Sequence, residues 1–256
     1  MSASSQSDLF HRFTAGVLTR LETLVESANA GGFNAAVDIL VQTIEAGGVI
    51  QAFGTGHSEA FAMEMADRAG GLIPTNKIAL RDVVLRGNVD PEMLNGSALE
   101  RNPNIAEELY ALGTVGKNDA FIIASNSGVN GSIVGLALVA KQHGHPLIAV
   151  TSMAHTMSVE PKHPSGKRLC DIADVVLDNY APFGDATLNF DGGVSVGAVS
   201  SITAAYIAQL LTIGTAERIR ASGKTPPVYI SANVPGGDSH NRALELQYEG
   251  RLNRTV

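Results

Sequence analysis

Three residues that could transfer protons follow a glycine-rich turn. His57, Glu59 and Glu64 come directly after an apolar run that ends in Gly54-Thr55-Gly56. A carboxylate can take a proton from carbon and a histidine can pass one on, so this set suits general acid–base catalysis. Glu64 follows His57 by seven residues, which places both on nearly the same face of a helix. The alternative for Glu64 is an i,i+4 ion pair with Arg68 on a solvated face, and Glu59 is then the rival base.

A second polar cluster follows the apolar run 119–124. It consists of Ser125-Asn126-Ser127-Gly128, with Asn130 and Ser132 close behind, and a helical pattern continues from there. Hydroxyl and amide groups at a helix N-terminus can bind a phosphate without any lysine. Ordinary capping needs only one such residue, so the cluster favours a ligand site. The predicted phosphate-binding residues are Gly54, Thr55, Gly56, Ser58, Ser125, Asn126, Ser127 and Asn130.

These motifs resemble the sugar isomerase (SIS) domain. The likeness rests on Ser125-x-Ser127-Gly128, on the later segment Gly144-x-Pro146-Leu147-Ile148-Ala149-Val150-Thr151, and on Gly54-x-Gly56-x-Ser58, which matches the family's first loop. It covers residues 33–215, approximately. The family includes phosphoheptose isomerase, the isomerase half of glucosamine-6-phosphate synthase, hexulose-phosphate isomerase and N-acetylmuramic acid 6-phosphate etherase. The resemblance therefore implies a phosphosugar ligand more firmly than it implies one reaction.

The reaction that the resemblance implies first is aldose–ketose isomerisation through an enediol. The segment around Glu64 resembles the part of phosphoheptose isomerase that carries its glutamate base, although its distance from Ser58 is about one helical turn shorter. Asn130 stands where the family more often has Ser or Thr. The histidine that phosphoheptose isomerase places on its long late helix has no equivalent in residues 192–216, so His240 or His163 is the candidate to replace it.

Two other functions stay open at this level. An etherase or lyase acting on an amino-sugar phosphate would use the same phosphate cradle, and a sugar-phosphate sensor would use it without turnover. The net charge of −7 argues against nucleic acid or an anionic membrane as a partner. No cofactor is expected, and no metal either, because His155 and His163 lack regular ligand spacing. The single cysteine, Cys170, excludes an intramolecular disulfide and suits a cytoplasmic protein, with its thiol packed rather than reactive.

The elements that must position these residues alternate between strand and helix. This alternation predicts an α/β fold with a doubly wound, parallel five-stranded sheet, whose ligands bind at the carboxyl ends of the strands. Both polar loops follow strands and can therefore face one pocket. The strands are expected at about 49–53, 78–85, 120–124, 146–152 and 170–179.

Extra helices are expected at both ends of a single SIS domain that spans residues 8–256. Residues 1–7 are expected to form a disordered tail. The periodic spacing of apolar residues predicts a pair of helices over 10–44. The uncharged run 192–216 is long enough for a membrane span, but its polar residues favour a helix buried in the core or at a subunit interface. A last helix is expected over about 241–251, capped by Asp238 or Ser239. Apolar surface beyond what one sheet covers predicts a homodimer or homotetramer through the late helix or the N-terminal helices.

Overall fold

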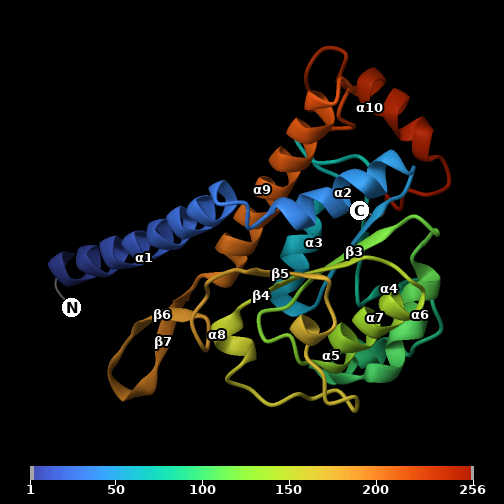
Figure 1. Cartoon of the computed structure of the whole chain (residues 1–256). Helices are drawn as coiled ribbons and strands as arrows, with labels where there is room; N and C mark the ends of the chain where they lie inside the picture. Colours follow the sequence, from blue (N-terminus) through green and yellow to red (C-terminus); the bar gives the residue numbers. More distant parts are fainter. Residues whose placement is uncertain (1–2, 255–256) are drawn as a thin grey trace.

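A five-stranded, all-parallel sheet forms the centre of the structure, in the order β2-β1-β3-β4-β5. The computed structural model describes residues 3–254. The prediction of a doubly wound parallel sheet is confirmed (Figure 1). The strands are β1 (Ile50–Gly54), β2 (Thr75–Ile78), β3 (Ala120–Ala124), β4 (Leu147–Thr151) and β5 (Val175–Asp178).

Helices cover both faces of this sheet, and a small hairpin stands apart from it. The helices are α1 (Ala3–Asn29), α2 (Asn34–Glu45), α3 (Glu59–Met65), α4 (Asp82–Leu85), α5 (Ala98–Arg101), α6 (Ala106–Leu112), α7 (Gly131–Gln142), α8 (Met153–Thr156), α9 (Ser200–Ala221) and α10 (Gly237–Glu245). The hairpin is β6 (Ala186–Asn189) with β7 (Ser195–Ala198). Short 3-10 turns are η1 (Gly56–Ser58), η2 (Pro91–Leu94), η3 (Pro103–Ile105), η4 (Leu169–Asp171), η5 (Asp191–Gly193) and η6 (Leu246–Tyr248).

The apolar runs become central strands because both of their faces are buried. Every residue of β1, β3 and β4 is buried, as is typical of strands in a sheet with helices on both sides. Side chains alternate between the two faces. On one face Ile50, Ile122 and Ile148 join a core with α2, α3 and α9. On the other face Phe121 and Ile123 join a core with α6 and α7.

The second strand lies earlier than predicted. Residues 75–78 form β2, whereas most of the expected strand 78–85 belongs to the turn that leads into α4 and to α4 itself. The Oδ2 atom of buried Asp82 accepts a hydrogen bond from the backbone N–H of Ala79 at 3.0 Å. This bond closes a helical turn after Ile78 and withdraws the segment from the sheet.

The uncharged run 192–216 is not one helix, as predicted, but the end of a hairpin followed by most of α9. Gly192, Gly193 and Gly197 have φ near +78°, a left-handed conformation that a helix excludes. The helix begins only at Ser200, where Asp185 accepts bonds from the N–H groups of Val199 and Ser200. The part of the run that is helical does pack into the core through Ala204, Ile207, Ala208 and Leu211.

Both ends of the chain also differ from expectation. Residues 3–7, expected to be disordered, continue α1 because no glycine or proline interrupts them, and residues 1–2 lie outside the described part. The last helix covers 237–245 instead of 241–251, and its N-cap is Gly236 in a left-handed conformation rather than Asp238 or Ser239. Within residues 3–254, no helix combines the length and hydropathy that crossing a bilayer requires.

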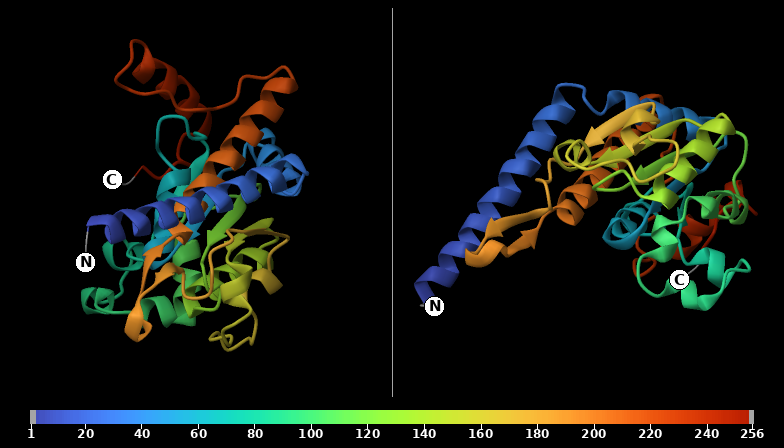
Figure 2. Two further views of the ribbon diagram at one scale, coloured as in Figure 1. Left: turned by 90° about the vertical axis from the view of Figure 1, so that its left-hand side faces the viewer. Right: turned by 90° about the horizontal axis from the view of Figure 1, so that it is seen from below.

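An arm projects from the sheet domain. It consists of the N-terminal half of α1 and the hairpin β6–β7, which lie side by side (Figure 2). The two elements enclose an apolar groove of about 530 Å³. Its walls are Gln6, Leu9, Phe10, Phe13, Leu188, Phe190, Val196 and Gly197, and none of these residues is charged.

Candidate functional site

The two polar loops meet at the carboxyl edge of the sheet. β1 and β3 are neighbouring parallel strands, and Gly54 lies opposite Ala124 at their ends. The strand order reverses between these two strands, since β2 lies beyond β1 while β4 lies beyond β3. Ligands of open α/β sheets bind at such a switch point. The fold therefore brings the first loop and the serine-rich loop to the position where a ligand site is expected.

A narrow crevice lies between the loops, with a cavity volume of about 10 Å³, room for roughly one water molecule. It unites four of the predicted residues, His57, Ser58, Ser125 and Asn126. The other lining residues are Phe61, Ala124, Val150, Asn179, Ser200, Ser201 and Ala204. Of these, Asn179 and the two serines are polar groups that the sequence reasoning missed. Asn179 directly follows the end of β5 and the serines open α9, so the topology was the available signal.

The serine hydroxyls divide into one that stabilises its loop and two that are free. Ser125 Oγ accepts a hydrogen bond from the Gly128 N–H at 3.1 Å and so closes the turn before α7. Gly128 itself has φ +63°, which suits glycine. Ser58 and Ser127 are half-buried, and their hydroxyls bond to no residue within 3–254. Of these two hydroxyls, that of Ser58 lines the crevice, and the exposed Ser201 hydroxyl there also bonds to no residue within 3–254.

Asn126 ties the serine-rich loop to the ends of the next two strands. Its Oδ1 accepts a hydrogen bond from Asn179 Nδ2 at 3.1 Å. Its carbonyl oxygen accepts from the Ser152 N–H and from Thr151 Oγ1, both at 3.3 Å. The loop is therefore held from three sides before any ligand binds, which lowers the entropy cost of binding.

Glu100 faces both predicted loops, although nothing in the sequence singled it out. Its Oε1 accepts hydrogen bonds from Thr55 Oγ1 at 2.9 Å and from Asn130 Nδ2 at 2.7 Å. Its backbone carbonyl accepts from Ser132 Oγ at 2.8 Å. Glu100 lies on α5, within the irregular segment 86–104. The only hint was that long irregular segments in compact domains are often functional.

Close backbone packing holds α5 in this place. Gly131 begins α7, and a Cβ atom there would lie 2.2 Å from the carbonyl oxygen of Arg101. No flexible side chain can yield, because the neighbouring atom is backbone. We expect Gly131→Ala to lower the free energy of unfolding by about 1–3 kcal/mol, measured by urea titration.

Gly16→Ala, in α1, is the matched control for this prediction. A Cβ atom at Gly16 would meet only the flexible end of the Arg20 side chain, at 3.4 Å, which is an ordinary contact distance. Alanine is also the better helix former, so this variant is expected to stabilise slightly. Equal stability of the two variants would contradict the account of Gly131.

The two carboxylates proposed from the sequence are both paired and do not line the crevice. Glu59 forms an ion pair with Arg81 at 2.7 Å. Glu64 pairs with Arg68 and accepts a hydrogen bond from Gln209 Nε2 of α9 at 2.6 Å. Glu64 is thus held against α9, while His57 is exposed at the crevice.

The other candidate histidines make local hydrogen bonds outside the crevice. His155 Nδ1 accepts from the Gly184 N–H at 2.9 Å, and its ring stacks on Phe183. His163 bonds to Ser165 Oγ at 2.9 Å, and burial lowers the pKa of His163. His240 bonds to the Val228 carbonyl at 3.1 Å. Within one chain none of them replaces the late-helix histidine at the crevice.

Neither a cation nor a thiol takes part in the crevice. No lysine or arginine lines it, so an anion there would be held by backbone N–H groups, hydroxyls and the N-terminus of α7. No cluster of three metal-binding side chains occurs within residues 3–254. Cys170 is a partly buried free thiol, and burial, with the nearby Asp171 carboxylate, raises its pKa.

Known proteins resemble this chain in sequence and in fold. The family model for the SIS domain matches residues 12–152. A UPF0309 protein of Geobacillus sp. (strain WCH70) is 31% identical over 245 residues, covering 95% of this chain and 97% of that protein. A UPF0309 protein of Listeria monocytogenes serovar 1/2a is 36% identical over 229 residues, covering 89% and 92%.

Two solved structures share the fold at low sequence identity. A phosphoheptose isomerase from Francisella tularensis superposes with a TM-score of 0.54 at 18% identity, covering 84% of this chain and 98% of that one. A protein of Escherichia coli CFT073, solved as a complex, superposes with a TM-score of 0.53 at 18% identity, covering 86% and 94%.

Proposed function

The chain belongs to the SIS-domain family, and from that premise we propose that it binds a sugar phosphate over the mouth of the crevice, against the two polar loops, and interconverts its aldose and ketose forms. The observation that carries the proposal is the convergence of the two polar loops at the switch point of the sheet, with Glu100 bonded to both. The phosphoheptose isomerase that shares the fold supports this ligand class.

The phosphate is assigned to the free hydroxyls and the backbone of the two loops. Ser58 donates from the crevice wall and Ser127 from the serine-rich loop next to it, and the N–H groups at the start of α7 add their partial positive charge. Ser125 and Asn126 hold the loop in shape, and Asn130 links it to Glu100. Such a cradle needs no lysine, which agrees with the absence of one from the crevice lining.

Glu100 is assigned as the base because its carboxylate lies against both loops. It removes the proton from the carbon next to the carbonyl, and the electron pair forms the carbon–carbon double bond of an enediolate. The carbonyl oxygen gains a proton and becomes a hydroxyl. The hydroxyl on the deprotonated carbon then loses its proton and its oxygen becomes the new carbonyl oxygen, while Glu100 returns its proton to the former carbonyl carbon. One base therefore serves both halves of the reaction. Glu64 and Glu59 remain the rival bases.

His57 is assigned to the oxygen atoms of the sugar. Its imidazole stands exposed at the crevice, where it can protonate the ring oxygen during ring opening or move a proton between the oxygen atoms on the two reacting carbons. A neutral imidazole can do both, because one ring nitrogen donates while the other accepts.

Solvent exchange tests the whole assignment. Each sugar phosphate of a panel of aldose, ketose and amino-sugar phosphates is incubated with the protein in D₂O and followed by proton NMR. An isomerase exchanges the proton on C2 of an aldose phosphate, or one proton on C1 of a ketose phosphate. Loss of a substituent without isomerisation would identify the etherase or lyase alternative. Binding without any exchange across the panel would leave a sugar-phosphate sensor.

We further propose that the chain acts as a homo-oligomer in the cytoplasm, joined through the arm. Phe10 exposes 64% of its surface, and Val194 and Val196 of the hairpin expose 58% and 40%. Exposed apolar patches of this kind mark interaction sites. The groove carries no charge in a protein of net charge −7, so two identical acidic chains can meet there without facing like charges.

The double variant Phe10→Asp/Phe190→Asp is therefore expected to sediment as a monomer at micromolar concentration, where the unmodified protein sediments as a dimer or larger. The reason is that burying two carboxylates per chain in an apolar interface costs several kcal/mol, on the order of the affinity itself. Leu85→Asp, an equally exposed leucine on α4, is the control and should leave assembly unchanged. A monomeric unmodified protein would refute the proposal.

A further inference from the structure

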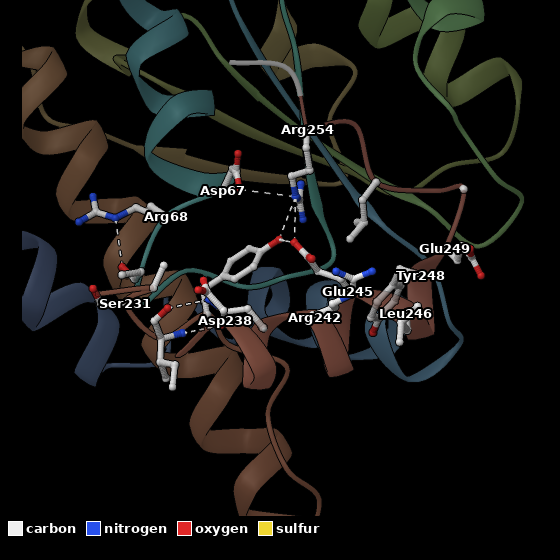
Figure 3. A pocket seen from close by; sticks show the side chains of 17 residues that line it. Asp67, Arg68, Ser231, Asp238, Arg242, Glu245, Leu246, Tyr248, Glu249 and Arg254 are labelled. Atoms are coloured by element: carbon white, nitrogen blue, oxygen red, sulfur yellow. Dashed lines mark hydrogen bonds and ion pairs between the residues drawn. The ribbon is translucent and has the colours of Figure 1, made fainter. Parts of the chain in front are cut away.

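A cavity of about 860 Å³ lies away from the crevice. It is enclosed by the residues after α3, the segment after α9, α10 and the C-terminal tail (Figure 3). Tyr229 and Tyr248 in its wall pack on Val49 and Ile73, which directly precede β1 and lead into β2. The cavity therefore lies at the amino edge of the sheet, opposite the crevice, and the proposed reaction makes no use of it.

One wall of the cavity is rigid, and its charges are satisfied internally. Arg254 donates to the carbonyl oxygens of Ile73 at 2.8 Å and Thr75 at 3.0 Å, and its Nε donates to the Tyr229 hydroxyl at 2.8 Å. That hydroxyl donates to Glu245 Oε1 at 2.6 Å. Burial, followed by the bond to Glu245, raises the pKa of Tyr229, which keeps the phenol protonated as a donor. The dashed lines of Figure 3 trace this network.

The charges on the other side of the cavity have no partners. The side chains of Asp238 and Arg242 on α10, and of Glu249 beyond it, make no hydrogen bond or ion pair with any residue of the described range 3–254. Both signs of charge are thus presented to one cavity. A simple anion would be attracted by Arg242 but repelled by the two carboxylates. A simple cation would be attracted by the carboxylates but repelled by Arg242.

Apolar side chains cover another part of the cavity wall. Leu246 exposes 60% of its surface, and Tyr248 and Leu252 contribute beside it. The volume falls within the range of small-molecule sites, roughly 300–1,000 Å³. The lining therefore complements a molecule that carries an ammonium group, an anionic group and an apolar body.

We propose that this cavity binds a small zwitterion. Asp238 or Glu249 takes the ammonium group, Arg242 takes the carboxylate or phosphate, and the apolar part lies on Leu246 and Tyr248. Two sources supply the paired charges, a short apolar peptide with free ends and an amino-sugar phosphate, and the peptide also supplies the apolar part. The site is distinct from the crevice, since the two lie at opposite edges of the sheet.

Matched ligands test each charge by isothermal titration calorimetry of the full chain. The probes are leucyl-leucine, its N-acetyl derivative, which lacks the ammonium group, and its C-terminal amide, which lacks the carboxylate. Each lost charge-assisted hydrogen bond is expected to weaken binding about ten- to a hundredfold. Glucosamine 6-phosphate, titrated into the Ser127→Ala variant to suppress the crevice, tests the second source.

Variants of the cavity supply the complementary test. Arg242→Ala and Asp238→Asn are expected to weaken binding of the preferred zwitterion about tenfold or more, while Ser127→Ala leaves dipeptide binding unchanged. Arg12→Ala, an exposed arginine on α1, is the control. Arg68 is left intact because it pairs with Glu64. Failure of both the dipeptide and glucosamine 6-phosphate to bind at millimolar concentration overturns the proposal. Equal binding of the N-acetyl dipeptide, or unchanged affinity in both cavity variants, overturns it as well.

Discussion

Glu100→Gln is expected to lower turnover of a sugar phosphate by about a hundred- to ten-thousandfold, the usual contribution of a positioned base. The amide oxygen of glutamine can still accept the hydrogen bonds that Thr55 and Asn130 donate, so the loops should keep their shape. What the variant loses is the ability to take a proton from carbon. Affinity for the sugar phosphate should therefore stay near normal. Steady-state kinetics and calorimetry on the same variant separate the two effects.

The two other carboxylates near the first loop are the controls for this assignment. Glu64→Gln disturbs an ion pair with Arg68 and a contact with α9, and Glu59→Gln disturbs an ion pair with Arg81. Neither change removes a carboxylate that is bonded to both polar loops, as that of Glu100 is, so both variants should retain most of their turnover. If Glu64→Gln or Glu59→Gln abolishes turnover while Glu100→Gln does not, the base moves to that residue. Full deuterium exchange at C2 in all three variants would refute catalysis by any of them.

Ser127→Ala is expected to weaken binding of the same sugar phosphate about ten- to a hundredfold. A hydrogen bond to a charged oxygen contributes on the order of 1.5–3 kcal/mol. The Ser127 hydroxyl makes no bond to any residue within 3–254, so its removal should cost the fold little. Calorimetric titration measures the affinity, and a urea titration of the free protein measures stability.

Two further serine variants are the controls for the prediction on Ser127. Ser158→Ala, at an exposed position outside the two loops, should leave affinity unchanged. Ser125→Ala removes the acceptor that closes the turn at Gly128, and should therefore lower both stability and affinity. If Ser127→Ala binds the sugar phosphate as the unmodified protein does, the serine-rich loop is an ordinary helix cap and not a phosphate cradle.

The strands of the core and the two polar loops could be predicted from the sequence because their determinants are local. Buried parallel strands need unbroken apolar runs such as 120–124, and a turn into a helix needs glycine and small polar residues. The parallel pairing then follows from the alternation of strands and helices. These rules placed Ser58 and Ser127 on adjacent loops without any knowledge of contacts.

Predictions from local sequence patterns were wrong where tertiary contacts or backbone conformation determined the structure. Residues 78–85 carry the apolar content of a strand, but the bond from the Ala79 N–H to Asp82 turns the chain into a helix. The uncharged run 192–216 resembles one helix, but left-handed glycines fold its start into the hairpin of the arm. In both segments the composition is compatible with either of two structures, and the backbone conformation at a few positions decides between them.

Only the tertiary structure decided which carboxylate lies beside the two polar loops. From the sequence, carboxylates can be chosen only by how closely they follow a predicted loop along a helix, and this criterion favoured Glu64 and Glu59. Glu100 lies further along the chain, in a segment without periodicity. It reaches the loops only because Gly131 lets α5 touch the backbone of α7. The sequence by itself predicted which groups could bind a phosphate, because such groups cluster at the starts of two helices. Which carboxylate faces them depends on contacts between distant segments, and no local rule encodes those contacts.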